Sequence, residues 1–253
     1  MDALESRVLV RSLVAGLCLG FLASNSLPAE PVSRAQIVAR LASGARDLSN
    51  LEAPGVDLSG VDFQGARLFG ANLEGADLSH ATLSRCNLDL SILRNAVLAG
   101  ANLQEASLFA VLLANANLAG ADLRGARLMS NLERVNLEGA NLSDLKGGAD
   151  MRNQPMGLIR IVLTHARLKG ANLTRADLSR GDLSYADLRE ADLSHANLTR
   201  SKLTGADLTG AVLDQATLTD AEIHDAIFKG SIALISVRGL ETTQGRETAI
   251  FDP

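Results

Sequence analysis

A five-residue period runs through most of this sequence and constrains its fold more than any other feature. From Leu58 to Leu128 a large apolar residue returns at every fifth position, and 14 of these 15 residues are Leu. Two residues before each of them, Ala occupies 10 of the 15 positions. A period of five fits neither the 3.6-residue repeat of a helix nor the two-residue alternation of a strand. Each unit must therefore combine a short straight segment with a bend.

The period continues in a second block after a slip and an interruption. From Leu163 to Phe228 there are 14 further units, 12 of them centred on Leu. Three units centred on Leu132, Leu137 and Leu142 lie between the blocks, displaced by one residue because Leu128 and Leu132 are four apart. The repeat blocks thus cover residues 56–144 and 161–230, with 32 units in total. Internal repeats of this regularity are typical of solenoid architectures.

The unit resembles the consensus A-(D/N)-L-x-x of the pentapeptide-repeat family, as in Ala71-Asn72-Leu73 and Ala76-Asp77-Leu78. The resemblance implies an all-β fold, a right-handed quadrilateral parallel β-helix with four units per coil, and hence about eight coils. The central Leu and the preceding Ala should point inward, because a narrow coil has no room for two large residues. Cys86 occupies an Ala position, so we expect a buried, inert thiol.

The N-terminal residues have the pattern of a cleaved signal peptide over 1–29. Arg7 and Arg11 precede an apolar stretch over 13–23, which small and polar residues follow. Cleavage is expected near Ser26 or Ala29, which predicts an exported protein of the periplasm or the thylakoid lumen. A short buried helix or an uncleaved anchor is the alternative. After cleavage we expect no stable membrane insertion, since no apolar run reaches the roughly 18 residues of a membrane span.

Caps are expected at both ends of the repeats, because a solenoid exposes its terminal edges. Residues 30–55 should hold an N-terminal capping helix and degenerate repeats, and Ser33 to Gln36 form a capping-box pattern that starts a helix over 33–43. Residues 46–55 look like two degenerate repeats. The period is lost after 230, and residues 231–253 are expected to form an irregular C-terminal cap.

Residues 145–160 interrupt the period and are expected to form an inserted loop. Gly147-Gly148 and the residues from Pro155 to Gly157 are turn signals. A long loop in a regular scaffold is often functional, and its candidate residues are Met151, Arg152, Pro155 and Met156. The other interpretation is a tolerated insertion.

One set of outward positions is apolar and forms a candidate interaction patch. Phe69, Asp89, Phe109 and Met129 follow core leucines at intervals of 20 residues, so they should stack on one face. Neighbouring outward positions are also apolar, and the candidate residues are Phe69, Leu90, Ile92, Phe109, Leu112 and Met129. Contiguous apolar patches mark contact sites. Either the loop at 145–160 covers this patch, or a partner or a second copy binds there.

The sequence shows no constellation typical of an enzyme. The four His residues have no metal-ligand spacing, and phosphate-binding, dinucleotide-binding and nucleophile-elbow motifs are missing. Stacked pairs such as Asp57 with Asp77 and Asp187 with Asp207 either hold a cation or, as we expect, bond to turn backbone. We therefore expect no catalytic, cofactor or metal site.

Net charge and composition limit the classes of partner that this protein can bind. A net charge of −5 with mixed signs gives no basic footprint for nucleic acid. We expect a non-enzymatic extracytoplasmic structural or protein-interaction scaffold without a cofactor. Its partner is either an unknown protein or a second copy of the chain in a homodimer. The family resemblance adds an alternative, a DNA-mimicking binder of DNA gyrase or topoisomerase. Basic residues interspersed among the acidic ones of the second block argue against such mimicry.

Overall fold

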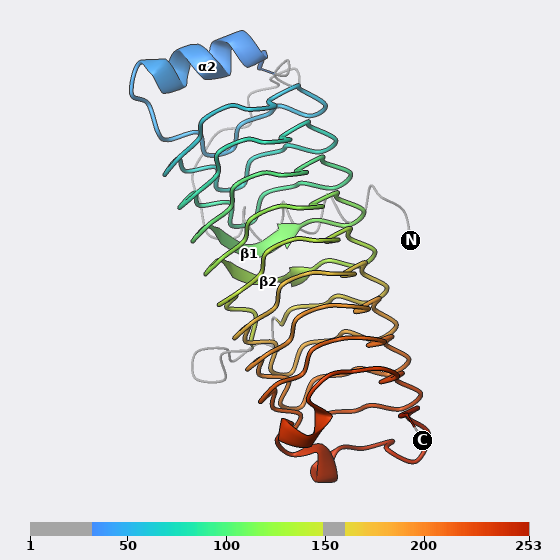
Figure 1. Ribbon diagram of the computed structural model, residues 1–253. Helices are drawn as coiled ribbons and strands as arrows, with labels where there is room; N and C mark the ends of the chain where they lie inside the picture. Colours follow the sequence, from blue (N-terminus) through green and yellow to red (C-terminus); the bar gives the residue numbers. More distant parts are fainter. Residues whose placement is uncertain (1–31, 149–159, 253) are drawn as a thin grey trace, which may run out of the picture. The chain divides into compact units, whose positions relative to one another are not determined.

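The computed structural model describes residues 32–148 and 160–252 (Figure 1). The chain divides into two units, Met1–Glu30 and Pro31–Pro253, and everything below concerns the second. The expected signal peptide and the loop residues Met151, Arg152, Pro155 and Met156 lie outside the described residues. Those expectations therefore stay predictions.

The repeats form coils that stack through parallel β-bridges between residues 20 positions apart (Figure 1). Each coil contributes one bridged residue to each of four bridge columns. Column 1 begins with Asp47, Arg67 and Asn87, and column 2 with Glu52, Asn72 and Ile92. Column 3 begins with Asp57, Asp77 and Val97, and column 4 with Asp62, Thr82 and Asn102. The 20-residue spacing confirms four five-residue units per coil.

Within each unit the bridged residue precedes the central Leu, and a turn follows. In the unit 96–100, Leu98 N–H donates to Asn117 O of the next coil at 2.7 Å, and Asn117 N–H donates to Ala96 O at 2.9 Å. Gly100 closes the turn in the left-handed region, with φ of 64°. The expected inward positions are confirmed, because the central leucines and the alanines before them are buried throughout the described repeats.

More coils form than the 32 regular units predict. The column 1 bridges occupy ten levels: Asp47, Arg67, Asn87, Ser107, Arg127, Lys146, Asp177, Asn197, Thr217 and Arg238. The additional levels come from units that lack the consensus. Leu48 and Ala53 are buried at central positions near the N-terminal end, and this agrees with degenerate repeats there.

The one-residue slip coincides with the two β-strands of the described chain. Strands β1 (Ser107–Leu112) and β2 (Arg127–Asn131) pair in parallel with Phe109 opposite Met129. Their register shifts between Phe109 and Leu112, where β1 holds one residue more than β2. At this corner the bridged residues continue around the bend of β1, where Ala110 has a left-handed φ of 52°.

Helix α2 (Arg34–Ala42) lies at the N-terminal end of the stack, where the capping helix was expected (Figure 1). Ser33 and Gln36 form the predicted capping box, and Ile37 and Leu41 are buried in the core cluster. The guanidinium of Arg34 donates to Asp57 O at 3.0 Å and to Ser59 O at 2.8 Å. The helix thus supplies apolar cover and hydrogen bonds to the first coil.

The interruption is shorter than the expected loop 145–160. Lys146 bridges Arg127 and Asp177, so residues 145–148 belong to the stack. Asn131 and Val162 bridge at a separation of 31 instead of 20, and the 11 additional residues match 149–159. The chain leaves and re-enters between columns 1 and 2.

The C-terminal residues continue the stack instead of forming an irregular cap. Ile232, Arg238, Gln244 and Ile250 bridge to the preceding coil at a spacing of six residues. Two short 3-10 helices, η1 (Leu234–Ser236) and η2 (Leu240–Thr242), occupy the corners of this coil. The longer unit arises because each corner takes a helical turn in place of a two-residue bend.

Side-chain oxygens replace backbone carbonyls at this end of the stack. In the regular coils a turn N–H donates to a carbonyl of the next coil, as Arg200 N–H does to Thr219 O at 2.9 Å. In the last coil the acceptors are Ser236 Oγ, Thr242 Oγ1, Thr248 Oγ1 and Asp252 Oδ2, at 2.7 to 3.0 Å. The six-residue coil therefore satisfies the turn donors of the last five-residue coil.

Candidate functional site

The six candidate patch residues lie together around the corner between columns 1 and 2. We call this group the apolar corner: Phe69, Leu90, Ile92, Phe109, Leu112 and Met129. Gly70 N–H donates to Asp89 O, and Leu90 N–H donates to Phe109 O, both at 2.9 Å, so the residues of successive coils stack as expected. Ile92 and Leu112 bridge each other in column 2. The candidate residues thus stack on one another around a single corner.

The apolar corner is shallow. Met129 is only 5% exposed, because it replaces a turn residue in the four-residue unit of β2. The other five side chains are half-buried, and none is among the large hydrophobic side chains that the described chain exposes. Met129 therefore supports the corner from inside, and the remaining five residues present its surface.

Polar groups fix the aromatic ring at the centre of the apolar corner. The guanidinium carbon of Arg127 lies 4.5 Å from the centroid of the Phe109 ring, a cation–π geometry. The Asp89 carboxylate accepts from Ser107 Oγ at 2.6 Å and from Phe109 N–H at 2.9 Å. The Asp89 carboxylate is thus hydrogen-bonded within the corner and does not form an ion pair with Arg127.

Basic side chains flank the apolar corner on two sides. Arg127 and Lys146 follow one another in column 1, and Arg94 lies at the turn beyond Ile92. Among the described residues, none of these three cations has a carboxylate at ion-pair distance. Many other cations do: Arg85 pairs with Glu105, Arg167 with Glu138, and Arg175 with Asp144. Acidic residues nevertheless lie close by, because Asp177 bridges Lys146 and Asp89 lies within the corner.

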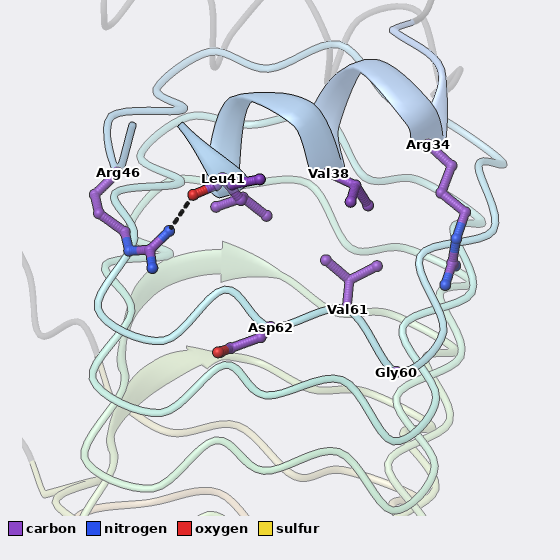
Figure 2. Close-up of a pocket in the computed structure, with 8 residues that line it drawn as sticks. Arg34, Val38, Leu41, Arg46, Gly60, Val61 and Asp62 are labelled. Carbon is purple, nitrogen blue, oxygen red and sulfur yellow. Dashed lines mark hydrogen bonds between the residues drawn. The ribbon is translucent and has the colours of Figure 1, made fainter. Parts of the chain in front are cut away.

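A second concavity lies beneath helix α2 (Figure 2). It has a volume of about 430 Å³, and Val38, Leu41 and Val61 contribute its apolar lining. Arg34 and Arg46 lie on opposite sides of these residues. Arg34 is bonded to Asp57 and Ser59, and Arg46 Nη1 donates to Leu41 O at 3.2 Å. Both cations therefore hold the cap in place rather than offering a converging ligand site.

The stacked acidic residues serve the turns, as expected. Asp57 Oδ1 accepts from Ser59 N–H at 2.9 Å, and Asp187 Oδ1 accepts from Arg189 N–H at 3.2 Å. Hydrogen bonds from Ser59 lower the pKa of Asp57, and those from Arg189 lower the pKa of Asp187. Within residues 32–148 and 160–252, no three His, Cys, Asp or Glu side chains gather closely enough to hold a metal ion.

Two further findings concern the described part of the chain. None of its helices has the length and apolar character needed to cross a bilayer. Cys86 is buried, its thiol donates to Phe63 O at 3.0 Å, and burial raises its pKa to about 11. The expected burial of the Cys86 thiol is confirmed.

Sequence reasoning found the apolar corner but missed its basic flanks. The signal was present, because Arg127 and Lys146 occupy equivalent positions once the four-residue unit is counted. It also missed the exposed isoleucines of the last coil, where Ile235 is fully exposed and Ile232 is 57% exposed. These residues lie beyond the regular period, so no repeat position marked them as outward.

Comparison with known proteins agrees with the repeat architecture. A family model described as pentapeptide repeats matches in overlapping stretches over 57–145, and again over 158–194 and 196–232. No curated protein matches the chain.

Several solved structures match. HetL, a pentapeptide repeat protein involved in heterocyst differentiation regulation in the cyanobacterium Nostoc sp. strain PCC 7120, is 30% identical. That match covers 87% of this chain and 94% of HetL, with a TM-score of 0.35. A pentapeptide repeat protein from the Arabidopsis thaliana thylakoid lumen is 26% identical over 68% of each chain, with a TM-score of 0.16.

QnrB1, a plasmid-mediated fluoroquinolone resistance protein, is 19% identical. The match covers 78% of this chain and 91% of QnrB1, with a TM-score of 0.33. The family model agrees with the 20-residue bridge spacing and the buried leucines. This chain belongs to the pentapeptide repeat family.

Proposed function

We propose that this protein is an exported, non-enzymatic protein-interaction scaffold that binds its partner at the apolar corner. The stack of coils, which we take to be a right-handed, four-sided β-helix, serves as a rigid support. The apolar corner carries the proposal, because it joins half-buried apolar side chains of three successive coils on a surface that is otherwise mainly polar. Fold alone does not define function, which resides in such local features.

The composition of the described surface supports a binding role over catalysis. Acidic residues are hydrogen-bonded to turns or paired with cations, as Asp187 is with Arg189. The two arginines of the concavity beneath α2 are already engaged, Arg34 with Ser59 of the first coil and Arg46 with Leu41 of the helix. A reaction needs convergent titratable groups in a pocket, and neither of these places supplies them.

Two observations support export: the sequence pattern of residues 1–29, and the position at which the second unit of the chain begins. The second unit begins at Pro31, and Val32 N–H donates to Glu52 O at 2.8 Å, the first contact of the described chain. Cleavage near Ser26 or Ala29 would leave the coils and helix α2 intact. The expected compartment is the periplasm or the thylakoid lumen.

Gyrase binding by DNA mimicry is the second candidate, and the described charges weigh against it. Mimicry of DNA requires a regular array of negative charge. Cations are interspersed with the acids in columns 1 to 3, for example Arg67 in column 1, Lys202 in column 2 and Arg167 in column 3. In column 4 two neutral residues separate successive acids, as Asn141 and Asn172 follow Asp122.

Photo-crosslinking in cells of the source organism tests the proposed role. A photoreactive amino acid at Leu112 in the apolar corner is compared with the same residue at Thr82, a bridged residue of column 4. We expect a discrete protein adduct from Leu112 and none from Thr82. Equal labelling at both positions, or none at Leu112, would contradict binding at the apolar corner.

A further inference from the structure

We propose that the first coil binds an extended segment of a partner protein at column 4. The segment adds to the coil as a further strand through the backbone N–H and C=O of Asp62, which we call the column 4 edge. One of its apolar side chains fills the concavity beneath α2. This contact is separate from the apolar corner and goes beyond the function proposed above.

The backbone of each bridged residue points toward the preceding coil. In column 4, Thr82 N–H donates to Val61 O at 3.0 Å, and Thr82 O accepts from Phe63 N–H at 2.8 Å. Asp62 is the first residue of this column, so the same two groups of Asp62 point beyond the first coil. Among the described residues neither group has a hydrogen-bond partner, and Asp62 is exposed. The column 4 edge is therefore a free ladder edge, to which an extended peptide can add.

The chain itself already pairs with the first coil at the two preceding columns. In column 2, Val32 N–H donates to Glu52 O at 2.8 Å. In column 3 the guanidinium of Arg34 donates to Asp57 O at 3.0 Å and to Ser59 O at 2.8 Å. The equivalent carbonyls of the next coil accept from backbone N–H groups, so Arg34 takes the place of two backbone donors. The column 4 edge continues this interface at the point where the chain supplies no such donor among the described residues.

The concavity beneath α2 gives space for a side chain beside the column 4 edge. Its volume is about 430 Å³, and Asp62 lines it together with Val38, Leu41 and Val61. Figure 2 shows Val38 of the helix and Val61 of the first coil pointing toward one another. Val38 is 42% exposed, although it is a large hydrophobic side chain. Asp47 in column 1 also lacks a backbone partner among the described residues, but it does not line this concavity.

These features identify the occupant as an extended polypeptide with an aliphatic side chain. Asp62 offers one donor and one acceptor on the same side, which an extended backbone can match and a helix cannot, because a helix uses its backbone groups internally. The apolar lining favours a side chain such as Leu, Ile or Val. Recognition does not depend on the two arginines, since Arg34 and Arg46 are already hydrogen-bonded.

Two pairs of variants test the backbone and the apolar contact separately. Asp62→Pro removes the N–H of the column 4 edge, and proline is tolerated where a strand N–H faces solvent. Asp62→Ala is its matched control, because it removes the same carboxylate and keeps the N–H. Val38→Ser alters the concavity, and Ala39→Ser is its control on an exposed position of the same helix outside the concavity. Circular dichroism and the thermal midpoint establish that each variant is folded.

The probe is a phage-displayed library of random twelve-residue peptides, selected on the purified protein. We expect enriched peptides with Leu, Ile or Val that bind wild type, Asp62→Ala and Ala39→Ser equally. They should bind Asp62→Pro and Val38→Ser about tenfold more weakly, because each variant loses one hydrogen bond or one apolar contact. Peptides that bind Asp62→Pro and Asp62→Ala equally would overturn the proposal.

Amide exchange measured by NMR gives a second test that needs no substitution. The Asp62 amide should exchange rapidly in the free protein, while the paired amide of Thr82 exchanges slowly, and a selected peptide should slow exchange at Asp62. A protected Asp62 amide in the free protein would show that the edge is already covered. Unchanged exchange with the peptide bound would place the peptide elsewhere, and either result would overturn the proposal.

Two further outcomes separate this contact from other occupants and from the apolar corner. A selection that yields only peptides lost on Leu112→Ser would overturn the column 4 contact and leave the proposed function in place. Sedimentation that shows a dimer dissociated by Asp62→Pro would assign the column 4 edge to a second copy and overturn the partner segment.

Discussion

Replacing Gly239 by Ala should destabilise the last coil far more than the same change at Gly230. A Cβ at Gly239 would lie 2.7 Å from Thr219 Cα and 2.8 Å from Thr219 N, so the clash is with backbone of the preceding coil. A Cβ at Gly230 meets its nearest such atom at 3.9 Å, an ordinary contact. Both residues have positive φ, 73° and 63°, so the conformational cost is shared and the contact with Thr219 differs.

The magnitude follows from these two contributions. A left-handed non-glycine residue costs about 1 kcal/mol, and overpacking a tight site costs about 1–3 kcal/mol more. We therefore expect a loss of about 1 kcal/mol for Gly230→Ala and about 2–4 kcal/mol for Gly239→Ala. Ala233 occupies the equivalent position of the preceding six-residue unit with φ of 61°, so a Cβ is tolerated there. The close approach of Thr219 is what sets Gly239 apart.

The assay is urea unfolding combined with hydrogen exchange of residues 231–252, because a terminal repeat can open separately from the rest. Gly239→Ala should lose exchange protection selectively in the last coil. Equal destabilisation by the two substitutions would refute the idea that six-residue units press the chain against the preceding coil.

Three further predictions concern the core, the thiol and the carboxylates, and one concerns the interruption. Leu118→Ala should destabilise by about 2–5 kcal/mol in urea unfolding, because Leu118 is fully buried and a cavity would remain; a cost below about 1 kcal/mol would contradict close packing. With Cys18 replaced by Ser, Cys86 should be inert to an aromatic disulfide reagent at pH 8 until urea is added, since burial raises its pKa to about 11. Rapid reaction of the native protein would be the opposite result. Hydrogen bonds from Arg175 lower the pKa of Asp144, and those from Arg189 lower the pKa of Asp187. The stability that these carboxylates contribute is therefore complete above the unfolded pKa of about 4 and is lost as pH falls through the lower folded pKa values. A urea midpoint that rises between pH 5 and pH 2 would contradict this sign. Deleting 149–159 restores the 20-residue spacing between Asn131 and Val162, so the protein should stay folded with unchanged thermal midpoint, dye binding and oligomeric state. Increased dye binding would show that this segment covers the apolar corner.

The regular coils could be predicted because every unit buries the same two side chains, a central Leu and the Ala two positions before it. Leu98 and Ala96 lie inward for the same reason as their equivalents 20 residues away. The slip at Leu128 was visible as a spacing of four, but its consequence was not. Only the structure shows that Met129 becomes buried and that β1 and β2 pair across the slip.

The last coil was missed because its hydrophobic period disappears while its turn chemistry persists. Gly239-Leu240-Glu241-Thr242 and Gly245-Arg246-Glu247-Thr248 repeat at a spacing of six. The Thr hydroxyls accept hydrogen bonds from turn N–H groups of the preceding coil. In this coil the repeat is therefore visible in polar residues, whereas in the other coils it is visible in Leu. A search for a period in Gly and Thr, rather than in apolar residues, would have found it.

The candidate site was predictable in position but not in chemistry. Counting two coils of 20 residues from Phe69 leads to Phe109, whichever side chains surround it. The pairing state of Arg127 and Lys146 depends on where every nearby carboxylate lies. That information comes from the stacked coils and not from the period.

Subcellular fractionation with N-terminal sequencing of the purified protein tests the central claim most directly. The account predicts a periplasmic or lumenal protein whose first residue lies a few positions before Val32, after cleavage near Ser26 or Ala29. A protein that begins with Met1 and fractionates with the cytoplasm would contradict it, and would return topoisomerase binding to consideration.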